Sequence, residues 1–254
     1  MTAEPLLAAD SVLVQAFVAA VLTMLATGLG AIPILFSRYF PDRLLGAGYA
    51  LAGGMMLSVS FFDLVLPGLD RGATWSLAAG YFLGACFFWL GDRYVERRDW
   101  RFAGLEGAGA RQVLLILATM FVHSFPEGVA IGVGYASGEI ELGIFIAVAI
   151  AIHNIPEGLA ISLPLAARGI GFWRCAGYSV LSSLPQPIAV VPAVLMIWLF
   201  EGLLAPGLGF AAGAMSYLVL AELLPESLSA AGKHATAWGF VLGFVAMMLA
   251  QYAL

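Results

Sequence analysis

The sequence predicts an all-α membrane protein with eight transmembrane helices. Of the 254 residues, 62% are hydrophobic and only 11% are charged, whereas soluble domains carry about 25% charged residues. The mean hydropathy is +0.97. The apolar residues gather in runs of about 20, the length that a helix needs to cross the hydrocarbon of a bilayer. Strands of a β-barrel are about half as long and alternate in polarity, and because these runs do neither, a β-barrel is not expected.

The apolar runs follow one another along the whole chain. Short segments join them, so neighbouring spans are expected to be antiparallel. The longest connector, 92–110, is rich in Arg and Gly and is expected to be a cytoplasmic loop. The chain 1–254 then forms a single transmembrane domain, with eight spans at about 11–36, 44–66, 74–91, 112–135, 140–164, 174–199, 203–225 and 235–254.

Basic residues indicate the orientation of this domain. The chain has 11 Lys and Arg residues, and all except Arg71 lie at connectors on one side. Because cytoplasmic connectors accumulate positive charge, both termini are expected outside the cell or in the periplasm. The protein is then a multi-pass protein of the plasma membrane, or of the inner membrane in a bacterium. The net charge of −5, with no basic face, argues against nucleic acid as a partner.

Polar residues inside the spans indicate where function lies. A charged side chain at the centre of a bilayer costs about 2.5–3.5 kcal/mol on insertion scales and usually marks a pathway. Both histidines of spans four and five stand about a dozen residues into their spans, which places them near the midplane at about 1.5 Å per residue. The intramembrane polar residues are Asp63, His123, Glu127, His153, Asn154, Glu157, Gln186 and Glu222.

The spacing of His123 and Glu127, repeated by His153 and Glu157, predicts a metal site. Residues four apart lie on one helical face, and two such faces from neighbouring helices can converge. Two imidazoles and two carboxylates suit Zn²⁺, Cd²⁺ or Fe²⁺, and the two carboxylates neutralise one dication. A single pair could also be a hydrogen-bonded pair that only fixes packing; the second copy favours the metal site.

A proline stands three residues after each histidine. Pro126 and Pro156 lack an N–H, so the carbonyls four residues earlier lose their helical partners, and we expect the helices to open there. Such backbone at membrane depth is tolerated where it lines a cavity or is buried in protein. The glycines that follow, Gly128 and Gly158, predict a close approach of neighbouring helices.

These motifs resemble those of the ZIP (Zrt/Irt-like) metal transporters, particularly the GufA-type branch. HSFPEGVAIG at 123–132 and HNIPEGLAIS at 153–162 are similar to the family's fourth and fifth spans. The second, sixth and seventh spans resemble LAGGMMLSVSFFDLVLPGL at 51–69, SSLPQPIAV at 182–190 and AAGAMSYLVLAELLPESL at 211–228. The resemblance implies uptake of divalent metal, usually zinc, toward the cytoplasm by a homodimer.

The resemblance also implies a centre for two ions. The first site would use His123, Glu127, His153 and Glu157, with both glutamates bridging to a second site at positions 124, 154 and 186. The chain departs from the family at two of these positions. Ser124 stands where Asn is common and Gln186 where Glu is common, while Asn154 is retained. Because a carboxylate is lost, the second site is predicted to be weak or empty.

Internal repeats predict how the spans are arranged. Spans four and five repeat one motif in opposite orientations, and LAGGMM at 51–56 is echoed by AAGAM at 211–215. This indicates inverted repeats in a 3+2+3 arrangement, which is typical of carriers with a site at the midplane. We expect alternating access, elevator-like as in ZIP-like proteins, with spans one, four, five and six moving against the others. The small residues of spans two and seven, among them Gly53, Gly54 and Gly213, would suit a close or sliding contact.

Other roles stay open at this point. Asp63, near the outer end of its span, and Glu222, near the inner end, are candidates for entrance and exit ligands, or are helix-end residues that reach the interface. A metal-selective channel would use the same site. An intramembrane zinc hydrolase is disfavoured because no HExxH motif occurs and because the prolines loosen the frame. The protein is therefore predicted to be no enzyme and to need no cofactor, only its transported ion.

Overall fold

The computed structural model describes residues 4–37, 41–71, 73–97, 108–167 and 169–253. Within these residues the chain is helical and forms no strand, which confirms the all-α class. The elements are α1 (Glu4–Leu29), η1 (Ile32–Leu35), α2 (Asp42–Val59), η2 (Ser60–Val65), α3 (Leu66–Asp70), α4 (Thr74–Arg97), α5 (Ala108–Ala136), α6 (Ile140–Ala167), α7 (Phe172–Ser182), α8 (Pro185–Leu199), η3 (Glu201–Leu203), α9 (Leu204–Leu218), η4 (Val219–Leu223) and α10 (Leu224–Ala253).

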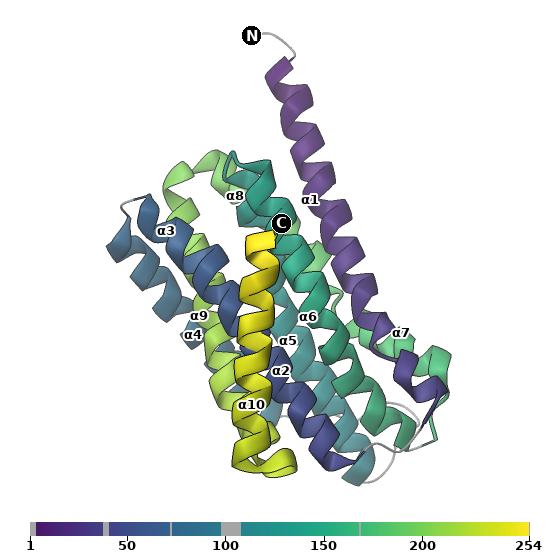
Figure 1. Cartoon of the computed structure of the whole chain (residues 1–254). Helices are drawn as coiled ribbons and strands as arrows, with labels where there is room; N and C mark the ends of the chain where they lie inside the picture. Colours follow the sequence, from purple (N-terminus) through teal and green to yellow (C-terminus); the bar gives the residue numbers. More distant parts are fainter. Residues whose placement is uncertain (1–3, 38–40, 72, 98–107, 168, 254) are drawn as a thin grey trace.

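Six segments of the described chain are long and apolar enough to cross a membrane: Ser11–Leu35, Asp42–Asp70, Thr74–Val95, Ile140–Leu163, Phe172–Leu199 and Glu201–Tyr252. The last is 52 residues long, and α10 bends inside it at Gly232, whose φ of 75° favours glycine. The chain descends along α9 and returns along α10, so that α1 begins and α10 ends toward the same end of the bundle (Figure 1). The membrane class is confirmed, and the count of eight spans stays a prediction.

Two boundaries differ from the sequence prediction. α4 continues to Arg97, so residues 92–97 of the predicted loop 92–110 are helical. The backbone hydrogen bonds of a helix do not depend on lipid, so a helix can continue through polar residues beyond its apolar span. Residues 98–107 lie outside the described part of the chain, and α5 begins at Ala108. The sixth span is split into α7 and α8 at residues 183–184, and Pro185 opens α8.

The two spans that echo each other in sequence also share a local distortion. Asp63 lies in η2 and Glu222 in η4, and both of these segments are π-helical. A π-helical turn accommodates an extra residue and is frequent at functional sites. Spans two and seven are therefore similar in backbone geometry as well as in their small residues.

Packing between helices agrees with the inverted repeat. α2 packs along α10 and α9 packs along α4, while α1 packs on α6 and α8 on α5. In the inverted repeat, spans one, two and three correspond to spans six, seven and eight, and span four corresponds to span five. The contact of α2 with α10 then corresponds to that of α9 with α4, and the contact of α1 with α6 to that of α8 with α5. The helices form a first group of α1 and α5 to α8, and a second group of α2, α4, α9 and α10. The two groups meet where α5 contacts α9 and where α2 contacts α6.

The glycines of spans two and seven pack inside the second group. A Cβ on Gly54 would collide with the backbone of Phe240 in α10, and one on Gly213 with the backbone of Tyr81 in α4. Gly53 faces η4. The close contact expected of these glycines is therefore confirmed, but it lies within the second group, so the glycines do not form the alternative, a sliding contact between the groups. They allow the close backbone approach that joins α2 to α10 and α9 to α4.

Aromatic side chains fill the contact between the groups. Phe87 of α4 lies between Phe125 of α5 and Phe210 of α9, with ring centroids 5.4 and 5.3 Å away. The next residue, Phe88, is fully buried, and its ring centroid lies 6.4 Å from that of His123. The second group thus reaches an imidazole of the predicted metal site.

Candidate metal centre

The four predicted first-site residues converge between α5 and α6. α5 contributes His123 and Glu127, and α6 contributes His153 and Glu157. Because the members of each pair are four residues apart, both side chains of a helix face its partner. All four are buried, with exposures between 0% and 4%. The structure therefore brings two imidazoles and two carboxylates together in the interior of the bundle.

The shortest contacts cross from one helix to the other. His123 Nε2 lies 3.0 Å from Glu157 Oε1, and His153 Nε2 lies 2.7 Å from Glu127 Oε1. Within each helix the corresponding distances are 3.5 Å and 3.9 Å. A tetrahedral zinc ion with bonds of about 2.0 Å separates its ligand atoms by roughly 3.3 Å. The observed distances bracket that value, and His123, Glu127 and Glu157 each offer a ligand atom within 4.8 Å of those of the other two. His153 adjoins this group through Glu127.

Three buried polar atoms in this region have no hydrogen-bond partner among the described residues: Nδ1 of His123, Nδ1 of His153 and Oδ1 of Asn154. Buried polar atoms are ordinarily paired, and leaving one unpaired costs about 1–3 kcal/mol. In both histidines it is Nε2 that faces a glutamate, so the unpartnered Nδ1 is not the atom that meets the carboxylates.

α5 and α6 continue as helices through Pro126 and Pro156, so the expected opening at these prolines does not interrupt them. The interruption lies instead in the neighbouring sixth span, at residues 183–184. The glycine prediction is confirmed. A Cβ on Gly128 would collide with the backbone of Gln186 in α8, and one on Gly158 with the carbonyl of Thr27 in α1. Close approach of α8 and α1 therefore brings their polar groups to the cluster.

The residues predicted for the second site, Ser124, Asn154 and Gln186, are buried. Gln186 donates from Nε2 to Glu127 Oε2 at 2.6 Å. Asn154 donates from Nδ2 to the carbonyl oxygen of Thr23 at 3.0 Å, and this Nδ2 also lies 3.5 Å from Gln186 Oε1. Asn154 and Gln186 thus join the cluster through hydrogen bonds, with Gln186 directly on a first-site carboxylate.

Two threonines of α1, which the sequence pattern did not single out, complete this region. Thr23 Oγ1 lies 2.7 Å from Gln186 Oε1, and Thr27 Oγ1 lies 2.8 Å from Ser183 Oγ. The available signal was their spacing of four residues, which places two hydroxyls on one face of an otherwise apolar span. Both hydroxyls contact residues that are more than 150 positions away in sequence, at α8 and just before it, and the spacing alone does not predict these partners.

The remaining candidates lie in the second group. Asp63 of η2 is 5% exposed and accepts a hydrogen bond of 2.7 Å from Gln251 of α10. Glu222 of η4 is half-buried. Neither carboxylate belongs to the cluster of metal-ligand type that the described residues contain, which comprises His123, Glu127 and Glu157.

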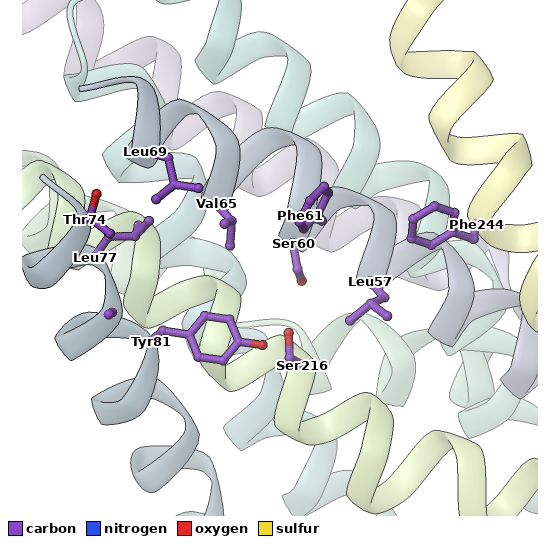
Figure 2. Close-up of a pocket in the computed structure, with 11 residues that line it drawn as sticks. Leu57, Ser60, Phe61, Val65, Leu69, Thr74, Leu77, Tyr81, Ser216 and Phe244 are labelled. Atoms are coloured by element: carbon purple, nitrogen blue, oxygen red, sulfur yellow. The ribbon is translucent and has the colours of Figure 1, made fainter. Parts of the chain in front are cut away.

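A cavity of about 590 Å³ also lies in the second group (Figure 2). Its walls come from α2 to α4, α9 and α10 and are mainly apolar, with the Tyr81 hydroxyl and Ser216 on one side. None of the predicted ligands lines it. The cavity is therefore separate from the candidate metal centre.

Comparison with known proteins agrees with these features. A family model described as ZIP Zinc transporter matches residues 104–251, which is more than half of the chain. The zinc transporter GufA of Myxococcus xanthus is 36% identical over 245 residues, covering 90% of this chain and 96% of that protein. The zinc transporter ZIPB of Bordetella bronchiseptica is 35% identical over 240 residues, covering 90% and 78%. A putative zinc transporter of Arabidopsis thaliana is 38% identical over 224 residues, or 87% of this chain, which spans only 36% of that protein's length.

Proposed function

The chain belongs to the ZIP family of zinc transporters, in its GufA-type branch, and from that premise we propose that it carries divalent metal, zinc above all, toward the cytoplasm. Cd²⁺ and Fe²⁺ are the other cargoes that the ligand set suits. The proposed setting is the plasma membrane, or the bacterial inner membrane, with both termini outside and with two copies forming a homodimer. Because the family is one of transporters, the alternative of an intramembrane hydrolase is set aside.

One observation supports the proposal most directly, namely the crossed contacts of the two His–Glu pairs. In the proposed site one dehydrated ion binds between His123, Glu127, His153 and Glu157, whose facing atoms are 2.7–3.9 Å apart. The two carboxylates balance the charge of a dication, so the bound ion leaves no net charge in the bilayer interior. Imidazole nitrogens favour zinc over Mg²⁺ and Ca²⁺, which prefer shells of oxygen.

We propose alternating access by relative movement of the two helix groups. All four ligands lie on α5 and α6 of the first group, so the ion would travel with that group. The second group, in which glycine contacts join α2 to α10 and α9 to α4, would act as the fixed part. Asp63 and Glu222, at the two π-helical turns of the second group, are proposed as entrance and exit ligands.

The second metal site, at Ser124, Asn154 and Gln186, is proposed to be weak or empty. Gln186 presents an amide N–H to Glu127 where a carboxylate would present an oxygen to an ion. A neutral donor on Glu127 Oε2 satisfies that oxygen and offers no charge to a second dication.

The test is metal uptake into proteoliposomes that contain the purified full chain. Glu127→Ala and Glu157→Ala are each expected to abolish zinc flux, because the variant loses one ligand and half of the compensating charge. Glu141→Ala is the matched control, since Glu141 is an exposed glutamate at the start of α6. Near-normal flux in both site variants would refute the proposed site. Flux that saturates at a low rate supports a carrier, and resolvable single-channel currents would identify a channel with the same site.

A further inference from the structure

A chain of hydrogen bonds runs from α1 through α8 to the proposed metal site. Thr23 Oγ1 lies 2.7 Å from Gln186 Oε1, and Gln186 Nε2 lies 2.6 Å from Glu127 Oε2. The three side chains are at most 2% exposed. Since water does not reach these groups from outside, each must find its partner within the protein.

We infer that Thr23 is a positioning residue that fixes the orientation of the Gln186 amide and, through it, restricts Glu127 to binding a single ion. The inference rests on the proposed first site. It concerns a residue of α1 that contributes no ligand itself and acts through Gln186.

The orientation of the amide follows from the partners at its two ends. A carboxylate accepts hydrogen bonds and cannot donate them, so the NH₂ of Gln186 has to face Glu127. Its Oε1 then faces the Thr23 hydroxyl, with Asn154 Nδ2 at 3.5 Å as a further donor. The Thr23 hydroxyl also lies 2.8 Å from the carbonyl oxygen of Ala20, so its one proton has two possible acceptors. Turning the amide over would place its carbonyl oxygen against the carboxylate and its NH₂ against the hydroxyl.

The consequence for metal binding concerns the two oxygens of Glu127. Oε2 is occupied by Gln186, while Oε1 lies 2.7 Å from His153 Nε2 on the ligand side. A glutamate that bridges two ions with one oxygen on each needs both oxygens free. With the amide held in place by Thr23, Glu127 offers one oxygen, already aimed at the first ion. Thr23 therefore supports both the affinity of the first site and its limit of one ion.

The experiment compares Thr23→Val, which removes the hydroxyl at nearly constant shape, with Thr23→Ser, which retains it. Isothermal titration of the purified full chain with Cd²⁺ measures affinity and stoichiometry. Thr23→Val is expected to weaken binding by about 2- to 10-fold, the range that one net hydrogen bond contributes, and Thr23→Ser is expected to bind like the parent. In a Gln186→Ala background, Thr23→Val should have no further effect, because its route to Glu127 is already removed.

Two outcomes would overturn the inference. The first is an equal loss of affinity from Thr23→Val with and without Gln186, which would show a general packing effect. The second is unchanged affinity in Thr23→Val. A Glu127→Ala control separates this inference from the proposed function. If Glu127→Ala abolishes Cd²⁺ binding while Thr23→Val is silent, only the role of Thr23 fails; if Glu127→Ala binds normally, the site itself fails.

Discussion

Replacing Gln186 by Glu is the perturbation that tests the proposed single-ion centre most sharply. The present amide lies 2.6 Å from Glu127 Oε2 and donates to it. In Gln186→Glu the donor becomes a second acceptor. Two unit charges at that separation repel each other by roughly 6 kcal/mol at an effective dielectric constant of about 20. Without an ion, the variant must take up a proton between the two carboxylates or lose stability.

A second dication would relieve this repulsion and occupy the place of the amide proton. We therefore expect Gln186→Glu to bind two Cd²⁺ or Zn²⁺ ions per chain where the parent binds one. Its ion-free form should also melt at a lower temperature, and metal should raise that temperature more than in the parent. A ligand at 100 times its dissociation constant stabilises a protein by about 2.7 kcal/mol, which is measurable as a thermal shift.

The assays are metal content by mass spectrometry after desalting, and thermal unfolding with and without metal. Gln186→Leu is the matched control, because it removes the amide without adding charge, so a second ion gained in Gln186→Glu beyond Gln186→Leu is due to the added carboxylate. Two fully occupied ions in the parent protein would contradict the reasoning, and so would a single ion in Gln186→Glu.

Two further predictions concern the contacts between and within the helix groups. Arg71 and Glu139 form an ion pair of 2.8 Å that links the α3–α4 connection of one group to the α5–α6 connection of the other. Glu139 is 65% exposed, and exposed ion pairs contribute at most about 1 kcal/mol. Arg71→Ala should therefore change the zinc uptake rate by less than about 5-fold. A complete loss of uptake would contradict so small a contribution from this ion pair. Gly54→Ala should destabilise the protein in thermal unfolding by about 1–3 kcal/mol, because its Cβ would press on the backbone at Phe240. Gly48→Ala in the same helix, with no neighbour within 4 Å, should leave stability equal or higher, and equal effects of the two changes would contradict the proposed packing.

The convergence of the predicted first-site residues could be anticipated because their geometry is local. A spacing of four residues within a helix places His123 beside Glu127 whatever the rest of the chain does. The repeated motif on the next span, with a short connection between them, makes the two helices antiparallel neighbours. Membrane depth follows in the same way from position within an apolar run. Each step depends on residues fewer than 40 positions apart.

Helix continuity was harder to predict from local chemistry. Pro126 and Pro156 remove backbone donors, yet α5 and α6 remain helical around them. The chain is interrupted instead beside Pro185, between α7 and α8. A missing hydrogen bond costs a helix less when neighbouring helices pack against it, so tertiary contacts select which of several prolines ends a helix.

Short-range chemistry in the chain thus specified the membrane class, the types of the candidate ligands and their pairing along each helix. The tertiary structure added the crossed partners, with His123 against Glu157 and His153 against Glu127, and brought Thr23 to Gln186 from 163 residues away. It also directed Gly54 and Gly213 into the second group, away from the contact between groups. The physical reason is that hydrogen bonds and close packing depend on distances of a few ångströms between helices, whereas sequence periodicity reports only which face of one helix a residue occupies.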